Sequence, residues 1–305
     1  MIAAQTHTAR WGQLVSEQVC GVLAGQEETV RWCLAAILAG GHILLEDIPG
    51  VGKTTLALAL SDALGLSFGR VQFTPDVMAT DVVGYSVPKE GEMCYKPGAV
   101  MCNLLLADEI NRAPSRTQAA LLEAMEEGQV TVDGVCRKLP KPFVLIATQN
   151  PLGAAGTQPL PDSQLDRFAV RLRLGYPGSE AEKDLVLGYF GKKVPKQVSS
   201  AEELLKLQAA VASTYICDAV ADYIVGLTAA TRKAFRILRG ASPRATLSLA
   251  AVAKAWAQLE GRDFVIPEDV QLAFLRCVPH RVLAAGDAGA RLRKIMGRIR
   301  QPKLC

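Results

Sequence analysis

The stretch EDIPGVGKTT, residues 46–55, constrains the fold of this chain more than any other. It follows HILLE, residues 42–46, a short apolar run that predicts a strand. The Leu and Ala spacing after it predicts a helix over about 53–64, closed by Gly65. A strand, a glycine loop and a helix in this order are the context of a phosphate-binding loop with the pattern G-x-x-x-x-G-K-S/T. The first glycine of that pattern is replaced here by Asp47.

The residues of this loop suit the phosphates of a nucleotide and a Mg²⁺ ion. Glycines let backbone N–H groups approach phosphate oxygens, and the helix that follows turns its positive end toward them. Lys53 would reach the outer phosphates, and Thr54 would give its hydroxyl to Mg²⁺. Asp47 would repel phosphate if it pointed inward, so we expect its side chain to point outward. The expected nucleotide-binding residues of the loop are Gly50, Val51, Gly52, Lys53, Thr54 and Thr55.

Polar side chains also follow two further apolar runs. CNLLLADE, residues 102–109, ends in Asp108 and Glu109, and PFVLIATQN, residues 142–150, ends in Asn150. Asp108 would hold Mg²⁺, usually through water, and Glu109 would orient and deprotonate an attacking water. Asn150 could help to place that water. Alone, each could be a cap or turn residue, but in this order they predict an ATP-hydrolysing site.

The chain changes character after about residue 176. Before it, apolar runs alternate with helical segments, which predicts an α/β fold with a parallel sheet flanked by helices. From 179 to about 300 the pattern is helical, with almost no strand signal. We therefore expect an α/β nucleotide-binding domain over 1–178, a linker over about 179–195 and an all-helical domain over 196–305.

Composition narrows the class of protein further. Half of the 305 residues are hydrophobic and 21% are charged, as in globular proteins. The eight cysteines form no C-x-x-C pair, so they are interpreted as buried apolar residues in a reducing compartment. No targeting segment and no run long enough to span a membrane is visible, which predicts a soluble cytoplasmic protein. The tail RLRKIMGRIRQPK, residues 291–303, could bind a polyanion, or it could be a solvated or subunit-facing helix.

Together these motifs resemble one family. EDIPGVGKTTLA, NLLLADEINRAPSRTQAALLEAMEEGQVTVDG, VLIATQNP and LPDSQLDRF are similar to the MoxR group of AAA+ ATPases, and the resemblance covers roughly residues 15–300. It implies a P-loop AAA+ core with a C-terminal all-helical lid, and ATP with Mg²⁺ as cofactors. That group commonly carries an acid at the position of Asp47. It also implies two protrusions, residues 82–100 and a β-hairpin before Asn150.

The resemblance also implies roles for single residues. The Walker A motif would include Lys53, with Thr54 and Asp108 as Mg²⁺ ligands. Glu109 would complete Walker B, and Asn150 would be sensor 1. Arg167 would be an arginine finger that reaches the γ-phosphate of the neighbouring subunit, and Arg244 would be sensor 2 in the lid. Gly25 and Gln26 would lie near the base, and Arg112 would be a possible interface residue.

Three functions are compatible with these residues. The first is an ATP-driven, chaperone-like remodeller, assembled as a hexameric ring, that matures partner complexes, often metal-dependent and with a von Willebrand A-type domain. The second is a nucleic-acid motor or a magnesium-chelatase-like metal-insertion subunit, which the basic tail favours. Nucleic acid is nevertheless not expected as a partner, because no zinc module, helix-turn-helix or OB-like region is visible. The third is a nucleotide-dependent scaffold, against which Glu109 argues.

Overall fold

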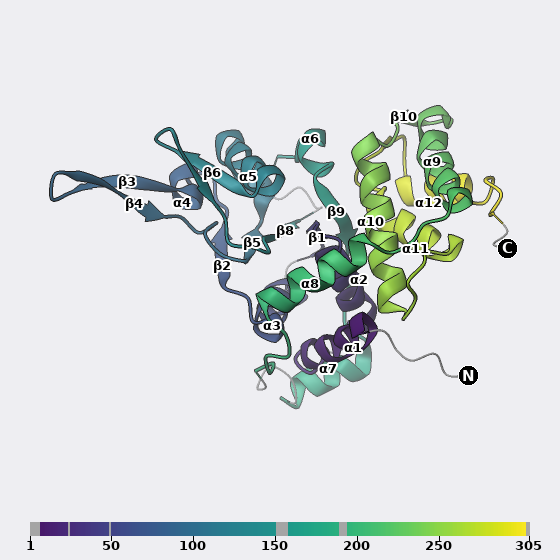
Figure 1. Cartoon of the computed structure of the whole chain (residues 1–305), viewed down its shortest axis with the longest axis horizontal. Helices are drawn as coiled ribbons and strands as arrows, with labels where there is room; N and C mark the ends of the chain where they lie inside the picture. Colours follow the sequence, from purple (N-terminus) through teal and green to yellow (C-terminus); the bar gives the residue numbers. More distant parts are fainter. Residues whose placement is uncertain (1–6, 24, 49, 151–157, 189–193, 303–305) are drawn as a thin grey trace.

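A five-stranded parallel sheet forms the centre of the computed structural model, with the strand order β2-β5-β8-β1-β9 (Figure 1). The strands are β1 (His42–Glu46), β2 (Phe68–Gln72), β5 (Leu104–Asp108), β8 (Val144–Gln149) and β9 (Phe168–Leu172). The structure describes residues 7–23, 25–48, 50–150, 158–188 and 194–302. The strand and helix predicted around the glycine loop are β1 and α3 (Lys53–Leu64), and Gly65 ends α3 with a φ of 62°.

Alternate residues of the central strands enter two separate hydrophobic cores. In β1, Ile43 and Leu45 belong to one core and Leu44 to the other. Successive side chains point to opposite faces of the sheet. Because both faces are covered, almost every position of the central strands is buried. The first core contains α1 (His7–Cys20), α2 (Glu27–Leu38) and α3, and the second contains α5 (Ser115–Glu127) with its neighbour α4 (Ala79–Val83).

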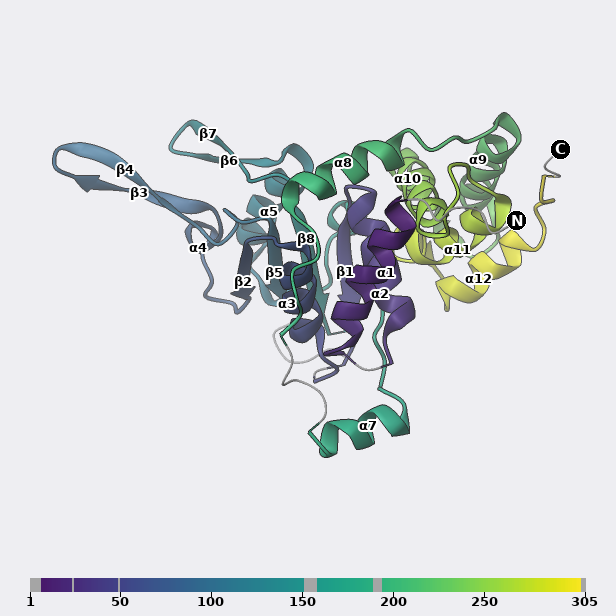
Figure 2. The same cartoon turned by 60° about the horizontal axis from the view of Figure 1, so that its bottom comes forward.

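Two β-hairpins project from one end of the molecule (Figure 2). They are β3 (Gly84–Lys89) with β4 (Glu92–Pro97), and β6 (Gln129–Val132) with β7 (Val135–Lys138). Asp133 and Gly134 form the turn of the second hairpin with φ values of 53° and 75°, which confirms the hairpin expected there. The guanidinium of Arg137 lies 3.9 Å from the ring centroid of Tyr95, so the two hairpins touch.

The opposite end of the molecule is helical (Figure 1). It contains α9 (Asp218–Lys233), α10 (Pro243–Leu259), α11 (Pro267–Cys277) and α12 (Ala288–Met296). α8 (Ala201–Ala212) lies nearer the middle of the molecule, against α2 and α10 (Figure 1). The pair β10 (Ile237–Arg239) and β11 (Leu283–Ala284) adds a short antiparallel contact. α7 (Ser179–Val186) lies within the expected linker, stands apart in Figure 2 and buries none of its residues. Among the described residues, no helix has the length and apolarity that crossing a membrane requires.

The helical end packs directly against the α/β part. Trp32 of α2 stacks on Trp256 of α10, with ring centroids 3.9 Å apart, and both parts contribute to the first core. The indole N–H of Trp11 donates to the Ser199 hydroxyl at 2.8 Å. These contacts set the orientation of the helical end relative to the sheet.

The described cysteines range from buried to exposed, and Cys20 and Cys217 are intermediate. Cys33, Cys102 and Cys277 are buried, and burial raises the pKa of the Cys33 thiol to about 12, so it stays protonated. The expectation of buried cysteines throughout is wrong for Cys94 and Cys136, which are exposed on the two hairpins. An antiparallel pair with no sheet packed on its outer face leaves these side chains in solvent.

Candidate nucleotide-binding site

The glycine loop joins β1 to α3 through two residues with left-handed backbone. Gly50 has a φ of 85°, and Gly52, at the N-cap of α3, has a φ of 93°. Side chains rarely tolerate these values. A Cβ on Gly52 would also lie 2.8 Å from Cδ1 of Leu23. Glycine therefore lets the loop follow this path without strain, and the path leads its backbone to the N-terminus of α3.

A cavity of about 350 Å³ lies over the loop, at the carboxyl ends of the parallel strands. Ligands bind at this edge of open α/β sheets. The residues that line the cavity are Gly50, Gly52, Lys53, Thr54, Thr55, Gln72, Asp108, Glu109 and Asn150. Most of the site residues expected from the sequence thus meet in one place. Val51 does not line the cavity, because its side chain packs against the first core.

Lys53 lines the cavity and is partly buried. Its ammonium donates to the carbonyl oxygen of Asp47 at 2.6 Å. Burial lowers the pKa of Lys53, and the charges of Asp47, Asp108 and Glu109 act in the opposite direction. The acids around Lys53 therefore favour its charged form, which is the form that binds phosphate.

Asp47 points away from the cavity, as expected. Its Oδ1 accepts a hydrogen bond from the backbone N–H of Ile48 at 2.9 Å, and its Oδ2 accepts one from Gly175 at 2.6 Å. Asp47 is not among the residues that line the cavity. The carboxylate ties the start of the loop to the segment after β9, which is a structural use for the acid that replaces the first glycine.

Thr148 contacts both acidic residues. Its hydroxyl donates to Oδ1 of Asp108 at 2.6 Å and accepts from the backbone N–H of Glu109 at 2.8 Å. Glu109 has a φ of 54°, rare for a residue with a side chain, and its carboxylate lies 3.2 Å from Nε of Arg112. Arg112, a candidate for an interface, thus contacts Glu109 of its own chain. Thr148 was not expected from the sequence. Its role follows only from its position in β8, next to the end of β5.

Asp108 has a second partner that the sequence reasoning also missed. Nη2 of Arg70, on the edge strand β2, lies 2.8 Å from Oδ2 of Asp108. The same nitrogen lies 3.1 Å from Oε1 of Gln72. A cation bound by Asp108 would share that oxygen with a guanidinium, so Arg70 would weaken the binding of Mg²⁺.

Replacing Arg70 by Gln is therefore expected to tighten Mg²⁺ binding, by up to about fivefold. The size follows from the value of a half-exposed ion pair, roughly 0.2–1 kcal/mol. Titration with Mn²⁺ as a spectroscopic probe, in the presence of a non-hydrolysable ATP analogue, measures the affinity. Arg10→Gln on the exposed side of α1 removes the same charge and serves as the control. Weaker binding in Arg70→Gln would show instead that Arg70 orients Asp108 for the metal.

Gly25 and Gln26, expected near the base, form the turn between α1 and α2. Gly25 has a φ of 68°, and Gln26 is 4% exposed at the N-cap of α2. The same turn carries Leu23, whose side chain lies against Gly52 of the glycine loop. This turn therefore borders the loop. Ala24, part of the same expected segment, lies outside the described residues.

Arg167 and Arg244 lie together, and neither lines the cavity of its own chain. Arg167 stands between the short helix α6 (Asp162–Leu165) and β9, and Arg244 lies in the first turn of α10. Both guanidinium groups bond to one carboxylate, that of Glu126 near the end of α5. The sequence pattern placed the two arginines in different domains and did not indicate that they meet.

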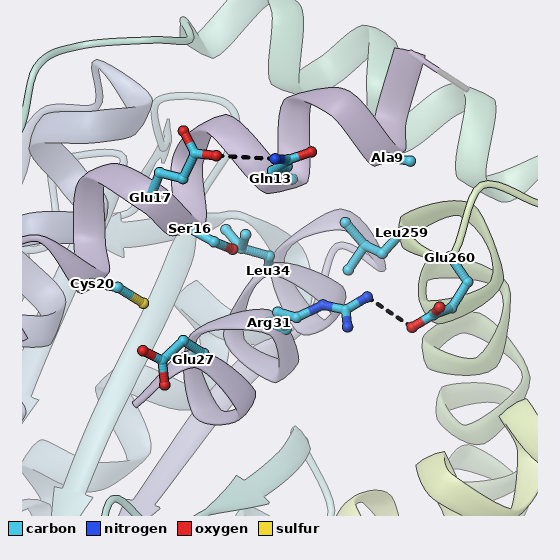
Figure 3. Close-up of a pocket in the computed structure, with 11 residues that line it drawn as sticks. Ala9, Gln13, Ser16, Glu17, Cys20, Glu27, Arg31, Leu34, Leu259 and Glu260 are labelled. Carbon is cyan, nitrogen blue, oxygen red and sulfur yellow. Dashed lines mark hydrogen bonds and ion pairs between the residues drawn. The ribbon is translucent and has the colours of Figure 1, made fainter. Parts of the chain in front are cut away.

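A second cavity, of about 600 Å³, lies between α1, α2 and the end of α10 (Figure 3). Figure 3 shows Arg31 reaching across it to Glu260, with Nη2 and Oε1 2.7 Å apart. Glu17 and Glu27 add two further acids to its lining. It contains none of the expected site residues and no glycine loop, so phosphates fit the smaller cavity over α3 better.

Fold and site together define the class of protein. A parallel sheet with a glycine loop after β1, paired carboxylates at the end of β5 and a helical lid are the features of an AAA+ ATPase. Residues 42–170 match the family described as "ATPase family associated with various cellular activities (AAA)", and residues 229–295 match the AAA lid domain. The predicted AAA+ core with a helical lid is confirmed.

Individual relatives identify the family. The chain is 43% identical over 299 residues to YeaC of Bacillus subtilis, covering 94% of this chain and 93% of that protein. It is 39% identical to Chaperone MoxR1 of Mycobacterium tuberculosis, covering 94% and 78% respectively. A crystal structure from Cytophaga hutchinsonii, of a protein assigned as an ATPase, superposes with a TM-score of 0.86 at 33% identity over 97% of each chain. The chain belongs to the MoxR family of AAA+ ATPases.

Proposed function

We propose that this protein hydrolyses ATP in the cavity over the glycine loop and uses the energy to remodel partner proteins, as a chaperone does. The observation that carries this proposal is the convergence of Lys53, Thr54, Asp108, Glu109 and Asn150 on one cavity. They come from three separate segments of the chain. A loop with only a structural role would not require a lysine and two carboxylates at the same end of the sheet.

The donor set of the cavity fits ATP and Mg²⁺. Backbone N–H groups at the start of α3 and the ammonium of Lys53 would bind the phosphates. Thr54 and Asp108 offer the oxygen ligands that Mg²⁺ prefers, and the ion would neutralise negative charge on the phosphates. Glu109 would accept a proton from the attacking water, and Asn150 would help to place that water.

Completion of this site by a neighbouring subunit supports a ring. Among the described residues that line the cavity, Lys53 is the only cation. Phosphoryl transfer is commonly accelerated by an arginine at the outer phosphate. Arg167 and Arg244 are bonded to Glu126 outside their own cavity, which suits both for the nucleotide of the next subunit. We therefore propose a closed homo-oligomer, with a hexamer as the expected size.

The partner is proposed from the relatives and from the hairpins. One relative is named a chaperone. The two hairpins expose large apolar side chains, among them Met93, at 67% exposure, and Val135, at 50%. These exposed side chains are proposed as contacts for a client protein. A partner with a von Willebrand A-type domain, or a metal-dependent complex, is the proposed client class.

The proposed ATP site is tested by Lys53→Ala, which is expected to weaken ATP binding about 10- to 100-fold. The charged hydrogen bonds lost on substitution are worth about 1.5–3 kcal/mol. Equilibrium titration with a fluorescent ATP analogue measures the affinity. Lys206→Ala is the control, because Lys206 is an exposed lysine of α8 paired with Glu202. ATP binding unchanged in Lys53→Ala would exclude this cavity as the nucleotide site.

A further inference from the structure

Glu126 gathers two arginines from different parts of the chain. Its Oε2 accepts from Nε and Nη2 of Arg167 at 3.0 and 2.6 Å, and its Oε1 accepts from Nη2 of Arg244. The three residues come from α5, from the segment before β9 and from the first turn of α10. One carboxylate therefore holds one guanidinium on each of its oxygens.

The backbone around Arg167 is fixed by separate contacts. Asp166 accepts from the hydroxyl of Ser242, with oxygen–oxygen distances of 2.9 and 2.8 Å, and Ser242 also caps α10. The carbonyl oxygen of Phe168 accepts from Nη2 of the buried Arg281 at 2.7 Å. These contacts attach both neighbours of Arg167 to the helical end. What they leave undecided is the direction of the long Arg167 side chain, and that is set by Glu126 and by a 2.5 Å hydrogen bond from Nη1 to the carbonyl of Ser163.

Glu126 stays ionised in this arrangement. The hydrogen bond from Arg167, and then the charges of Arg167 and Arg244, lower the pKa of the carboxyl. Its side chain is 40% exposed, so water screens the ion pairs, and their contribution to folding is small. The benefit of the arrangement is instead geometric: a carboxylate between two guanidinium groups offsets their mutual repulsion and holds them side by side.

We propose that Glu126 is a positioning residue, which presents Arg167 and Arg244 as one unit to the nucleotide of the neighbouring subunit. This inference rests on the proposed function, in which both arginines act across the subunit contact. Two long side chains lose rotamer freedom when they meet a phosphate. If Glu126 has already ordered both arginines, a smaller entropic cost remains when they bind the phosphates in the transition state of ATP hydrolysis.

The first test is ATP turnover by Glu126→Gln. We expect kcat to fall about 10- to 100-fold, since a misplacement of about 1 Å can cost a hundredfold. The affinity of the variant for ATP should stay within about twofold of the wild type, because its own cavity is intact. Glu127→Gln is the matched control: Glu127 is the next residue of α5 and contacts only Gln129 among the described side-chain hydrogen bonds. Turnover equal to this control, or above the wild type, would overturn the proposal; a rise would mean that Glu126 restrains the arginines.

The second test separates positioning from a general structural fault. Glu126→Gln subunits mixed with Glu109→Gln subunits should regain turnover, because the latter supply intact arginines to the intact cavities of the former. Glu126→Gln mixed with Arg167→Ala should not. Adding Glu126→Gln to Arg167→Ala should lower kcat less than it does in the wild type. No regained turnover in the first mixture, or full additivity, would overturn the proposal. If wild type and Lys53→Ala hydrolyse ATP at the same rate, the proposed function itself fails, which is a different outcome.

Discussion

Replacing Glu109 by Gln is expected to lower kcat for ATP hydrolysis by about a hundredfold to ten-thousandfold, while ATP still binds. The amide keeps the size of the side chain but cannot accept the proton of the attacking water, and general bases typically contribute effects of this order. The fold of the site should survive, because the hydrogen bond that holds residue 109 beside Thr148 comes from its backbone N–H.

Phosphate release under saturating ATP measures the turnover, and a fluorescent ATP analogue measures binding separately. Glu92→Gln is the control, since Glu92 is exposed at the start of β4 in the first hairpin and is not among the residues that line the cavity. Should the Glu109 variant turn over ATP at the rate of this control, another group would have to accept the proton, and the role proposed for Glu109 would be wrong. If the variant lost both ATP binding and turnover, Glu109 would instead be needed to hold the glycine loop in place.

Replacing Arg167 by Ala is expected to lower kcat about a thousandfold or more, the effect typical of an arginine finger. In the variant, the cavity of each subunit keeps all of its own lining residues, because Arg167 is not among them. ATP affinity should therefore change little. Turnover per subunit of the wild type should rise with protein concentration, because an active site would exist only where two subunits meet.

The decisive measurement is again a mixture of variants. Arg167→Ala supplies intact cavities and Glu109→Gln supplies intact arginines, so the mixture should hydrolyse ATP faster than either variant alone. Arg116→Ala, at an exposed position in the first turn of α5, controls for loss of an arginine. A strictly monomeric wild type whose turnover per subunit is constant with concentration would rule out an arginine acting in trans.

Much of the α/β part could be predicted from the sequence because its signals are local. The apolar run of β1, the glycines of the loop and the Leu–Ala spacing of α3 each specify their own backbone. β2 was missed, because Gly69, Arg70 and Gln72 make this edge strand too polar and too exposed to show an apolar pattern. The omission mattered, since Gln72 lines the cavity and Arg70 bonds to Asp108. The domain boundaries stay a prediction.

The sequence determined some features of the candidate site, and the tertiary structure decided others. The sequence by itself determined the loop, the two carboxylates and the family, because a residue's type and its near neighbours decide where a chain can turn and which charge follows a strand. Only the tertiary structure brought Thr148 beside Asp108, turned Asp47 to Gly175 and placed Arg167 and Arg244 on Glu126. These contacts join residues 40 to 128 positions apart. Strand order and helix packing bring such residues together, and neither can be read from the spacing along the chain.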